Sequence, residues 1–232
     1  MVRVAHRRRR EVSEALRYLR EIPDDLGPAI AAAVRGRGRI GDEAIIATLV
    51  DWAARGIATV RTAPRHVTTI AGPIEEQTLE FVLDVDRWAE LDRTEQALGN
   101  LLFTQLARSA ALGLLDLKTA MRRGKADYLR GRDIWRATVV DEAVRRGLLQ
   151  PGGKRRTEAG DALAETLDAL ERYLADFGAF EDDPVAAHVL WGRYLAFAAL
   201  FGEAERVLDE LGLDIPGDLH DTALALRALA AR

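Results

Sequence analysis

The sequence predicts a mainly α protein with short β-hairpins, built from two winged-helix-like units and a C-terminal helical hairpin. Apolar residues recur at helical spacing through most of the chain, and runs rich in β-branched residues follow a central helix. The segment that starts at Ala47 is also echoed at Ala137, and each copy is a helix that ends in Arg-Gly before apolar residues. Helices followed by a hairpin indicate the winged-helix plan, and the second copy, with helices followed by the short apolar Leu148-Leu149, indicates a second unit of the same kind.

The composition fits one large or two small domains. Of the 232 residues, 48% are hydrophobic, which is enough to build real cores. The chain has no cysteine, so disulfides, thiolate metal sites and cysteine nucleophiles are excluded, and a reducing compartment is compatible. A net charge of -4 with 30% charged residues is typical of an ordinary soluble surface. Any basic face for nucleic acid must therefore be local.

Residues 1–22 form the first predicted segment, an N-terminal basic helix. Apolar side chains over residues 11–20 share one helical face, and Ile22-Pro23 ends the helix. The N-terminus lacks the apolar core of a signal peptide, and no stretch of the chain reaches the apolar length of a membrane helix. The chain as written is therefore expected to be soluble.

Residues 23–90 form the first winged-helix-like unit. Pro28 opens one helix, and Asp42 begins a strongly apolar second helix that Gly56 closes. Strand signals follow over residues 57–61, 67–71 and 78–85.

Residues 91–151 form the second unit. Helices are expected over residues 94–107, 115–123 and 125–146. Gly124 and Gly147 stand where the last two helices should end, since glycine readily takes the left-handed conformation of a helix C-terminus.

Residues 152–232 form a helical hairpin and a terminal helix. Asp183 and Pro184 suit the N-cap and first turn of the second hairpin helix, and Asp218 suits the N-cap of the last helix. Aromatic residues at helical spacing more often belong to a hydrophobic core than to a ligand-binding site. The aromatic residues of this hairpin are Tyr173, Phe177, Trp191, Tyr194, Phe197 and Phe201.

Three motifs in this C-terminal region carry a family resemblance. They are T-E-A-G-x-x-L from Thr157, E-R-Y-L-x-D-F from Glu171, and W-x-x-Y-L-x-F-A-x-L-F-G-x-A-E-R from Trp191. These motifs resemble the cytoplasmic C-terminal region of a predicted membrane protein family that is catalogued only as domain of unknown function 2207. The match covers most of residues 23–211. Ala196 stands where the family usually has proline, so the resemblance does not imply a proline kink in this helix.

The resemblance implies a protein at the membrane. Members are similar in having an extracytoplasmic N-terminal domain, a membrane helix and a cytoplasmic region interrupted by a hydrophobic hairpin. A cytoplasmic location at the inner face of the membrane is therefore expected, through segments that this chain does not contain. Basic residues gather on the cytoplasmic side of membrane helices. The candidate flanks are Arg7, Arg8, Arg9, Arg10, Lys154, Arg155 and Arg156. A solvated charge run and a plain Gly152-Gly153 loop remain the alternative.

Two functions follow as hypotheses. The first is a protein-interaction or scaffold module, because winged helices also serve as protein-binding units. Its protein partner is unidentified, and the oligomeric state stays open. The alternative is a DNA-binding regulator whose cations neutralise phosphates. The candidates for that role are Arg35, Arg37, Arg39, Arg122, Arg123, Lys125, Arg130 and Arg132. Against it, the helix from Asp42 begins with two acids and contains no Asn or Gln to read bases.

The sequence offers no enzyme motif. The pattern Gly36-x-Gly38-x-x-Gly41 satisfies the dinucleotide fingerprint formally, but it follows a predicted helix and not a strand. The two serines lie outside any nucleophile elbow, and the four histidines are isolated from metal-binding partners. We therefore expect no catalytic, cofactor or metal site.

Overall fold

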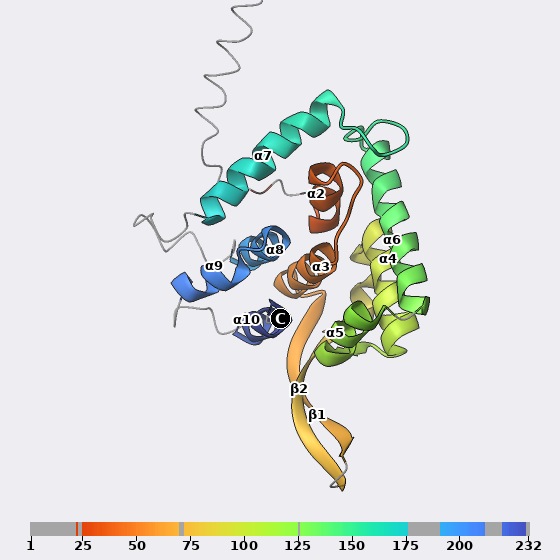
Figure 1. Ribbon diagram of the computed structural model, residues 1–232, viewed down its shortest axis with the longest axis vertical. Helices are drawn as coiled ribbons and strands as arrows, with labels where there is room; N and C mark the ends of the chain where they lie inside the picture. The colour runs from red at the N-terminus through yellow and green to blue at the C-terminus, as the bar shows by residue number, and fades with distance from the viewer. Residues whose placement is uncertain are drawn as a thin grey trace, which may run out of the picture.

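The computed structural model describes residues 22, 25–69, 72–124, 126–175, 191–211 and 220–230. Within these ranges, helices dominate and three strands form a small antiparallel sheet (Figure 1). The predicted mainly α class is therefore confirmed, while the short β-hairpins expected are, in the described residues, one hairpin of two 12-residue strands with a third short strand. The winged-helix assignment of the two units stays a prediction, and so do the boundaries of the four segments.

Helix α3 (Glu43–Ala54) lies at the centre of the helical body (Figure 1). Its buried side chains cover several faces of the helix and include Ile45, Leu49 and Trp52. Helices α2 (Pro28–Arg35) and α8 (Trp191–Phe201) pack against it. A helix that is apolar on most faces must be surrounded by protein, which explains why α3 is enclosed. Its end at the left-handed Gly56 is as predicted.

A long hairpin of β1 (Ala58–Thr69) and β2 (Gly72–Leu83) extends away from the helices (Figure 1). The separate strand expected over residues 67–71 is wrong, because Val67 pairs with Ile74 inside β1. The sequence contains Pro64, but β1 is an edge strand, and an edge strand tolerates a residue that lacks an N–H donor.

A third strand, β3 (Ala111–Gly113), pairs with the base of β2 and was not predicted. Three residues are too few for a periodic signal. Because β3 comes from the predicted second unit and β2 from the first, the two segments share one sheet. Buried residues from Ile22 to Leu226 likewise form one continuous core.

The helix expected over residues 94–107 is two different structures. Helix α4 (Arg93–Gly99) is followed by the π-helix η2 (Asn100–Ala107), which ends at the left-handed Arg108. Apolar spacing does not distinguish α from π turns over so short a distance, so the sequence signal was ambiguous. The 3₁₀ helix η1 (Val85–Glu90), which precedes α4, was not predicted either.

The remaining helices follow the predicted order. They are α5 (Leu114–Arg123), α6 (Ala126–Arg145), α7 (Glu158–Ala175) and α10 (His220–Ala230). A separate helix, α9 (Ala204–Leu211), was not predicted: it follows a break at the left-handed Gly202. Gly124 and Gly147 end α5 and α6 with positive φ, as expected. The predicted helix over residues 11–20, the caps Asp183 and Asp218, and the side chains of Phe177 and Trp191 lie outside the described residues.

The aromatic hairpin formed by α7 and α8 packs its rings inward. Tyr173 and Tyr194 meet with ring centroids 6.0 Å apart, and Phe197 and Phe201 meet at the same separation. Phe197 is fully buried and Phe201 partly so. Offset and tilted pairs of this kind stabilise a core beyond their buried area. Since α8 packs on α3, this aromatic hairpin lies beside the central helix.

The enclosure of α3 can be tested by making the same Ile→Ala substitution at a buried and at an exposed position. Ile45→Ala removes a fully buried side chain from α3 and should lower the free energy of unfolding by about 2–5 kcal/mol. Ile134→Ala, in an α6 side chain that is 59% exposed, should change it by no more than about 0.5 kcal/mol. Urea denaturation measures both, and equal losses would contradict the placement of α3.

Candidate functional site

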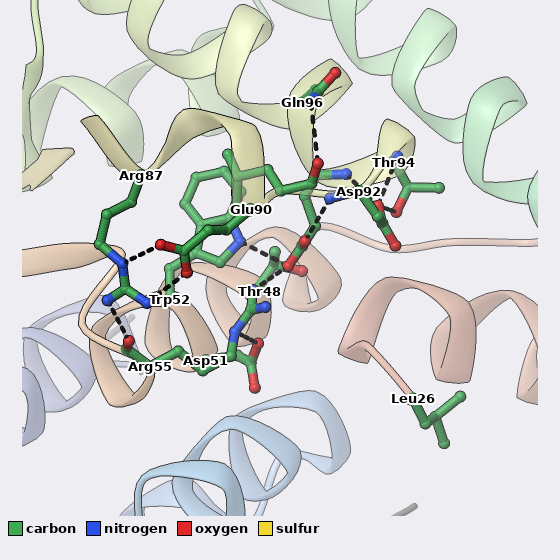
Figure 2. Close-up of polar contacts among 12 residues, drawn as sticks. Leu26, Thr48, Asp51, Trp52, Arg55, Arg87, Glu90, Asp92, Thr94 and Gln96 are labelled. Atoms are coloured by element: carbon green, nitrogen blue, oxygen red, sulfur yellow. Dashed lines mark hydrogen bonds and ion pairs between the residues drawn. The ribbon is translucent and has the colours of Figure 1, made fainter. Parts of the chain in front are cut away.

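A polar network joins the end of α3 to α4 (Figure 2). The indole N–H of Trp52 donates to Glu95 Oε1 at 3.0 Å, and Arg55 also donates to this oxygen. The second oxygen of Glu95 accepts the backbone N–H of Asp92 at 2.9 Å, completing a capping box at the start of α4. One carboxylate therefore fixes α4 against α3.

Arg87 connects η1 to the same end of α3 (Figure 2). Its guanidinium donates to the backbone carbonyl of Arg55 at 2.7 Å and to Glu90 at 2.6 and 2.9 Å. A cation at the carbonyl end of a helix satisfies an acceptor that the helix leaves unpaired, and it opposes the negative pole of the helix dipole. As a result η1 is held beside α3.

Asp51 joins α3 to α8 from the inside. Its side chain is only 4% exposed and lies 2.9 Å from Arg55 Nε and 3.8 Å from Arg193 Nε. Arg193 also donates to the carbonyl of Leu26 at 3.0 Å. Burial raises the pKa of Asp51, whereas the charges of Arg55 and Arg193 lower it. A carboxylate so enclosed serves as a tertiary tie and is poorly placed to meet a substrate.

The network continues to α6 through Arg146. This side chain lies 3.3 Å from Asp92 and 2.8 Å from Glu142, which also bonds Arg145 at 2.6 Å. The hydrogen bond from Arg145, supported by Arg146, lowers the pKa of Glu142 to about 2. Helices α3, α4 and α6 are thus tied together by charged groups at their ends.

An open groove lies between η1, η2 and the start of β3. Its volume is about 620 Å³, and its lining consists of Leu83, Val85, Trp88, Gln96, Asn100, Phe103, Thr104, Arg108, Ser109 and Ala110. Trp88 packs so closely on Gly99 that a Cβ there would clash with the indole ring. Phe103 stacks on Trp52 with centroids 6.4 Å apart. The floor of the groove is therefore aromatic and rigidly supported.

The rim of this groove is polar and carries one cation. Arg108 is exposed, has a left-handed backbone (φ 54°), and makes no ion pair within the described part of the chain. Ser109 Oγ accepts the backbone N–H of Ala111 at 3.2 Å, which leaves its hydroxyl proton able to donate. The arrangement suits an apolar group next to a carboxylate. Sequence reasoning missed it, because the only signal was a helical apolar pattern.

The structure separates the predicted nucleic-acid candidates. Arg35 is bound to Glu171 at 2.5 Å and lies over the Phe201 ring at 4.6 Å, and Arg132 lies 3.3 Å from Asp42. Both are engaged in tertiary contacts. The other described candidates are exposed and have no ion pair with the residues that the structure describes: Arg37, Arg39, Arg122, Arg123 and Arg130. Lys125 lies outside the described residues.

Two sets of cations predicted for different roles meet at one end of the molecule. The turn after α2 touches the turn after α6, because Gly38 packs on the backbone of Gly153. Arg37 and Arg39 flank Gly38 in the first turn, and the second turn leads into the predicted membrane flank.

Within that flank, Lys154 and Arg155 are exposed, whereas Arg156 lies 3.5 Å from Asp161. The other predicted membrane flank, Arg7 to Arg10, lies outside the described residues.

The side chains that commonly hold a metal ion are scattered in the described part of the chain. No three His, Asp or Glu residues there are grouped to hold a metal ion. The Gly36, Gly38 and Gly41 pattern forms the turn between α2 and α3, so it follows a helix, as the sequence indicated. No helix in the described ranges is both long and apolar enough to cross a bilayer.

The charge network predicts a pH dependence. The pKa of Glu142 lies near 2 in the folded state against an ordinary 4.5, so its ion pairs stabilise the fold above pH 4.5 and are lost as the pH falls toward 2. Glu142→Gln should therefore lower stability at neutral pH and flatten the acid side of the stability curve. Urea unfolding between pH 7 and pH 3 measures the stability of both proteins. The control is Glu165→Gln, which changes an exposed carboxylate on α7. Parallel acid limbs in all three proteins would contradict it.

The comparisons with known proteins bear on the whole chain. The family model described as predicted membrane protein (DUF2207) C-terminal domain matches residues 15–150 and 143–211. No curated protein and no solved structure gave a match. The two matched stretches cover most of the sequence, so the resemblance found in the C-terminal motifs is confirmed. The chain belongs to the family of the predicted membrane protein (DUF2207) C-terminal domain.

Proposed function

We propose that this chain is a protein-contact module of a membrane-associated protein. The observation that carries the proposal is the open groove, whose lining includes Trp88, Phe103 and the exposed Arg108, a cation that makes no ion pair with a described residue. Family membership supports the association with a membrane. We place the module at the cytoplasmic face, and we assign it no catalytic role.

The groove selects for one kind of occupant. Val85 is 62% exposed and, with Trp88 and Phe103, offers an apolar surface to an incoming side chain. Aromatic residues and arginine are enriched where protein interfaces gain most of their binding energy. Arg108 adds a charge that favours a carboxylate. The occupant we propose is a partner peptide in which an apolar residue stands beside an acidic one.

The polar network supports this role by keeping the groove in shape. Glu95 and Arg87 fix α4 and η1 on α3, so the two walls hold their spacing without a ligand. A site that is already formed loses less conformational entropy on binding. The buried carboxylate of Asp51 belongs to this support.

The DNA-binding alternative has weaker support. In a winged helix, a recognition helix enters the major groove, but α3 is buried among α2, α8 and the hairpin base. The hairpin that would act as the wing carries the exposed carboxylates of Glu75 and Glu76, which repel phosphate. Only exposed cations such as Arg122 and Arg123 remain favourable to this reading.

The peptide groove predicts a defined selectivity. Peptides selected from a random display library on the wild-type chain should share an apolar residue next to Asp, Glu or a free C-terminus. Arg108→Gln should weaken their binding about tenfold, equivalent to roughly 1.4 kcal/mol, because the carboxylate loses its counter-ion. Val85→Asp should weaken binding by more than Arg108→Gln does, because a carboxylate at residue 85 would repel the carboxylate of the peptide. Fluorescence anisotropy measures each affinity.

Matched controls lie away from the groove. Arg122→Gln removes an equally exposed charge, and Ile134→Asp adds a charge at an exposed apolar site. Both should leave peptide affinity unchanged, and circular dichroism should show that all variants fold. The proposal fails if no peptide is enriched, or if groove and control variants bind alike.

A further inference from the structure

We infer that the end of the molecule formed by the α2–α3 turn and the α6–α7 turn docks on an anionic phospholipid surface. The inference deepens the proposed membrane association and specifies which face meets the bilayer. The surface is separate from the peptide groove in both its residues and its chemistry.

The two turns are held together by close backbone packing. Gly38 (φ 82°) lies against the carbonyl of Gly153 (φ 71°), and Gly153 in turn lies against Val140 of α6. A Cβ at either glycine would clash, and positive φ also disfavours other residues. Because the turns are fixed to each other, the cations that they carry form one surface although they are more than a hundred residues apart in sequence.

Four cations on this surface lack a partner in the part of the chain that the structure describes. Lys154, Arg155, Arg37 and Arg39 are exposed, and none makes an ion pair with a described residue. We name these four the basic end.

Neighbouring arginines behave differently. Arg35 is bound to Glu171 and Asp168, and Arg156 is bound to Asp161. Carboxylates nearby in sequence do not pair with the basic end either: Asp42 lies 3.3 Å from Arg132, and the exposed Glu43 and Glu158 form no ion pair with a described residue. The structure thus pairs the inner cations and leaves the outer ones free for an external anion.

Acidic charge at the opposite end of the molecule favours a lipid surface. The α6–α7 turn lies near one end of the molecule and the β1–β2 hairpin points toward the other (Figure 1). Near the hairpin tip, Glu75 and Glu76 are exposed and form no ion pair within the described ranges. An anionic bilayer attracts the basic end and repels the hairpin, so the charges orient the molecule on the surface.

The basic end consists of turns, and its shape argues against duplex DNA. Within the described ranges, no helix or ribbon projects from it to enter a groove, since α3 leads directly into the core. Exposed cations next to anionic lipid headgroups each contribute about 1 kcal/mol, which is roughly fivefold in affinity per residue.

The test compares two variants with the same change of net charge. The first combines Arg37→Gln, Arg39→Gln, Lys154→Gln and Arg155→Gln in the full chain. The control combines Arg93→Gln, Arg122→Gln, Arg123→Gln and Arg130→Gln, all exposed and without a described ion pair. Co-sedimentation is measured with vesicles of phosphatidylcholine mixed with phosphatidylglycerol, and with phosphatidylcholine alone.

The wild-type chain should bind the mixed vesicles, bind phosphatidylcholine alone far more weakly, and release as salt is raised. The basic-end variant should lose roughly several hundredfold in affinity, at about fivefold for each of its four cations, and the control should stay within about threefold of wild type. Both variants should keep the wild-type melting transition and the affinity for groove peptides, so that failure of this inference is distinct from failure of the groove.

Three results would overturn the inference. Equal losses in the two variants would show that overall charge, and not this surface, drives binding. If the basic-end variant bound the mixed vesicles as tightly as wild type, other cations, such as Arg7 to Arg10, would be responsible for the attraction. Tighter binding of random duplex DNA than of mixed vesicles, lost in the same variant, would assign the surface to nucleic acid.

Discussion

The burial of α3 is the constraint on which the rest of the structure depends. A helix enclosed by protein must find partners for its polar groups, because an unpaired buried polar group is costly. Thr48 satisfies itself by donating to the carbonyl of Ala44 at 2.7 Å, but Asp51 and Trp52 need groups from elsewhere. Trp52 donates to Glu95 on α4, whereas Asp51 pairs with Arg55 at the end of α3 and lies 3.8 Å from Arg193 on α8, so elements distant in sequence are drawn to one helix.

The groove is a consequence of that arrangement. The end of α3 accepts Arg87 from η1, and its tryptophan stacks on Phe103 of η2, so both walls of the groove are built on the same helix end. The wide turns of η2 then stop at the left-handed Arg108, which leaves a cation at the rim. π-helical turns are frequently found at functional sites, and here one lines the best-supported candidate.

The position of an arginine in the fold decides whether it pairs with a carboxylate of the protein or faces solvent. Arginines near the core, including Arg35, Arg132 and Arg146, are bound to carboxylates of other helices. Arginines on turns, such as Arg37 and Arg155, are left facing solvent. Residue type does not distinguish the two groups, which explains why the sequence assigned Arg35 and Arg37 to one set. A protein with a net charge of -4 can still present a basic end opposite a hairpin with exposed carboxylates near its tip.

The sequence by itself determined the family, the mainly helical class, and the helix ends at Gly56, Gly124 and Gly147. These depend on local preferences, since glycine at a helix end and apolar spacing act within a few residues. Only the tertiary structure decided that β3 joins the hairpin, that Gly38 meets Gly153, and that a groove opens beside η2. Such features arise from contacts between segments far apart in the chain, and no local pattern specifies which segments will meet.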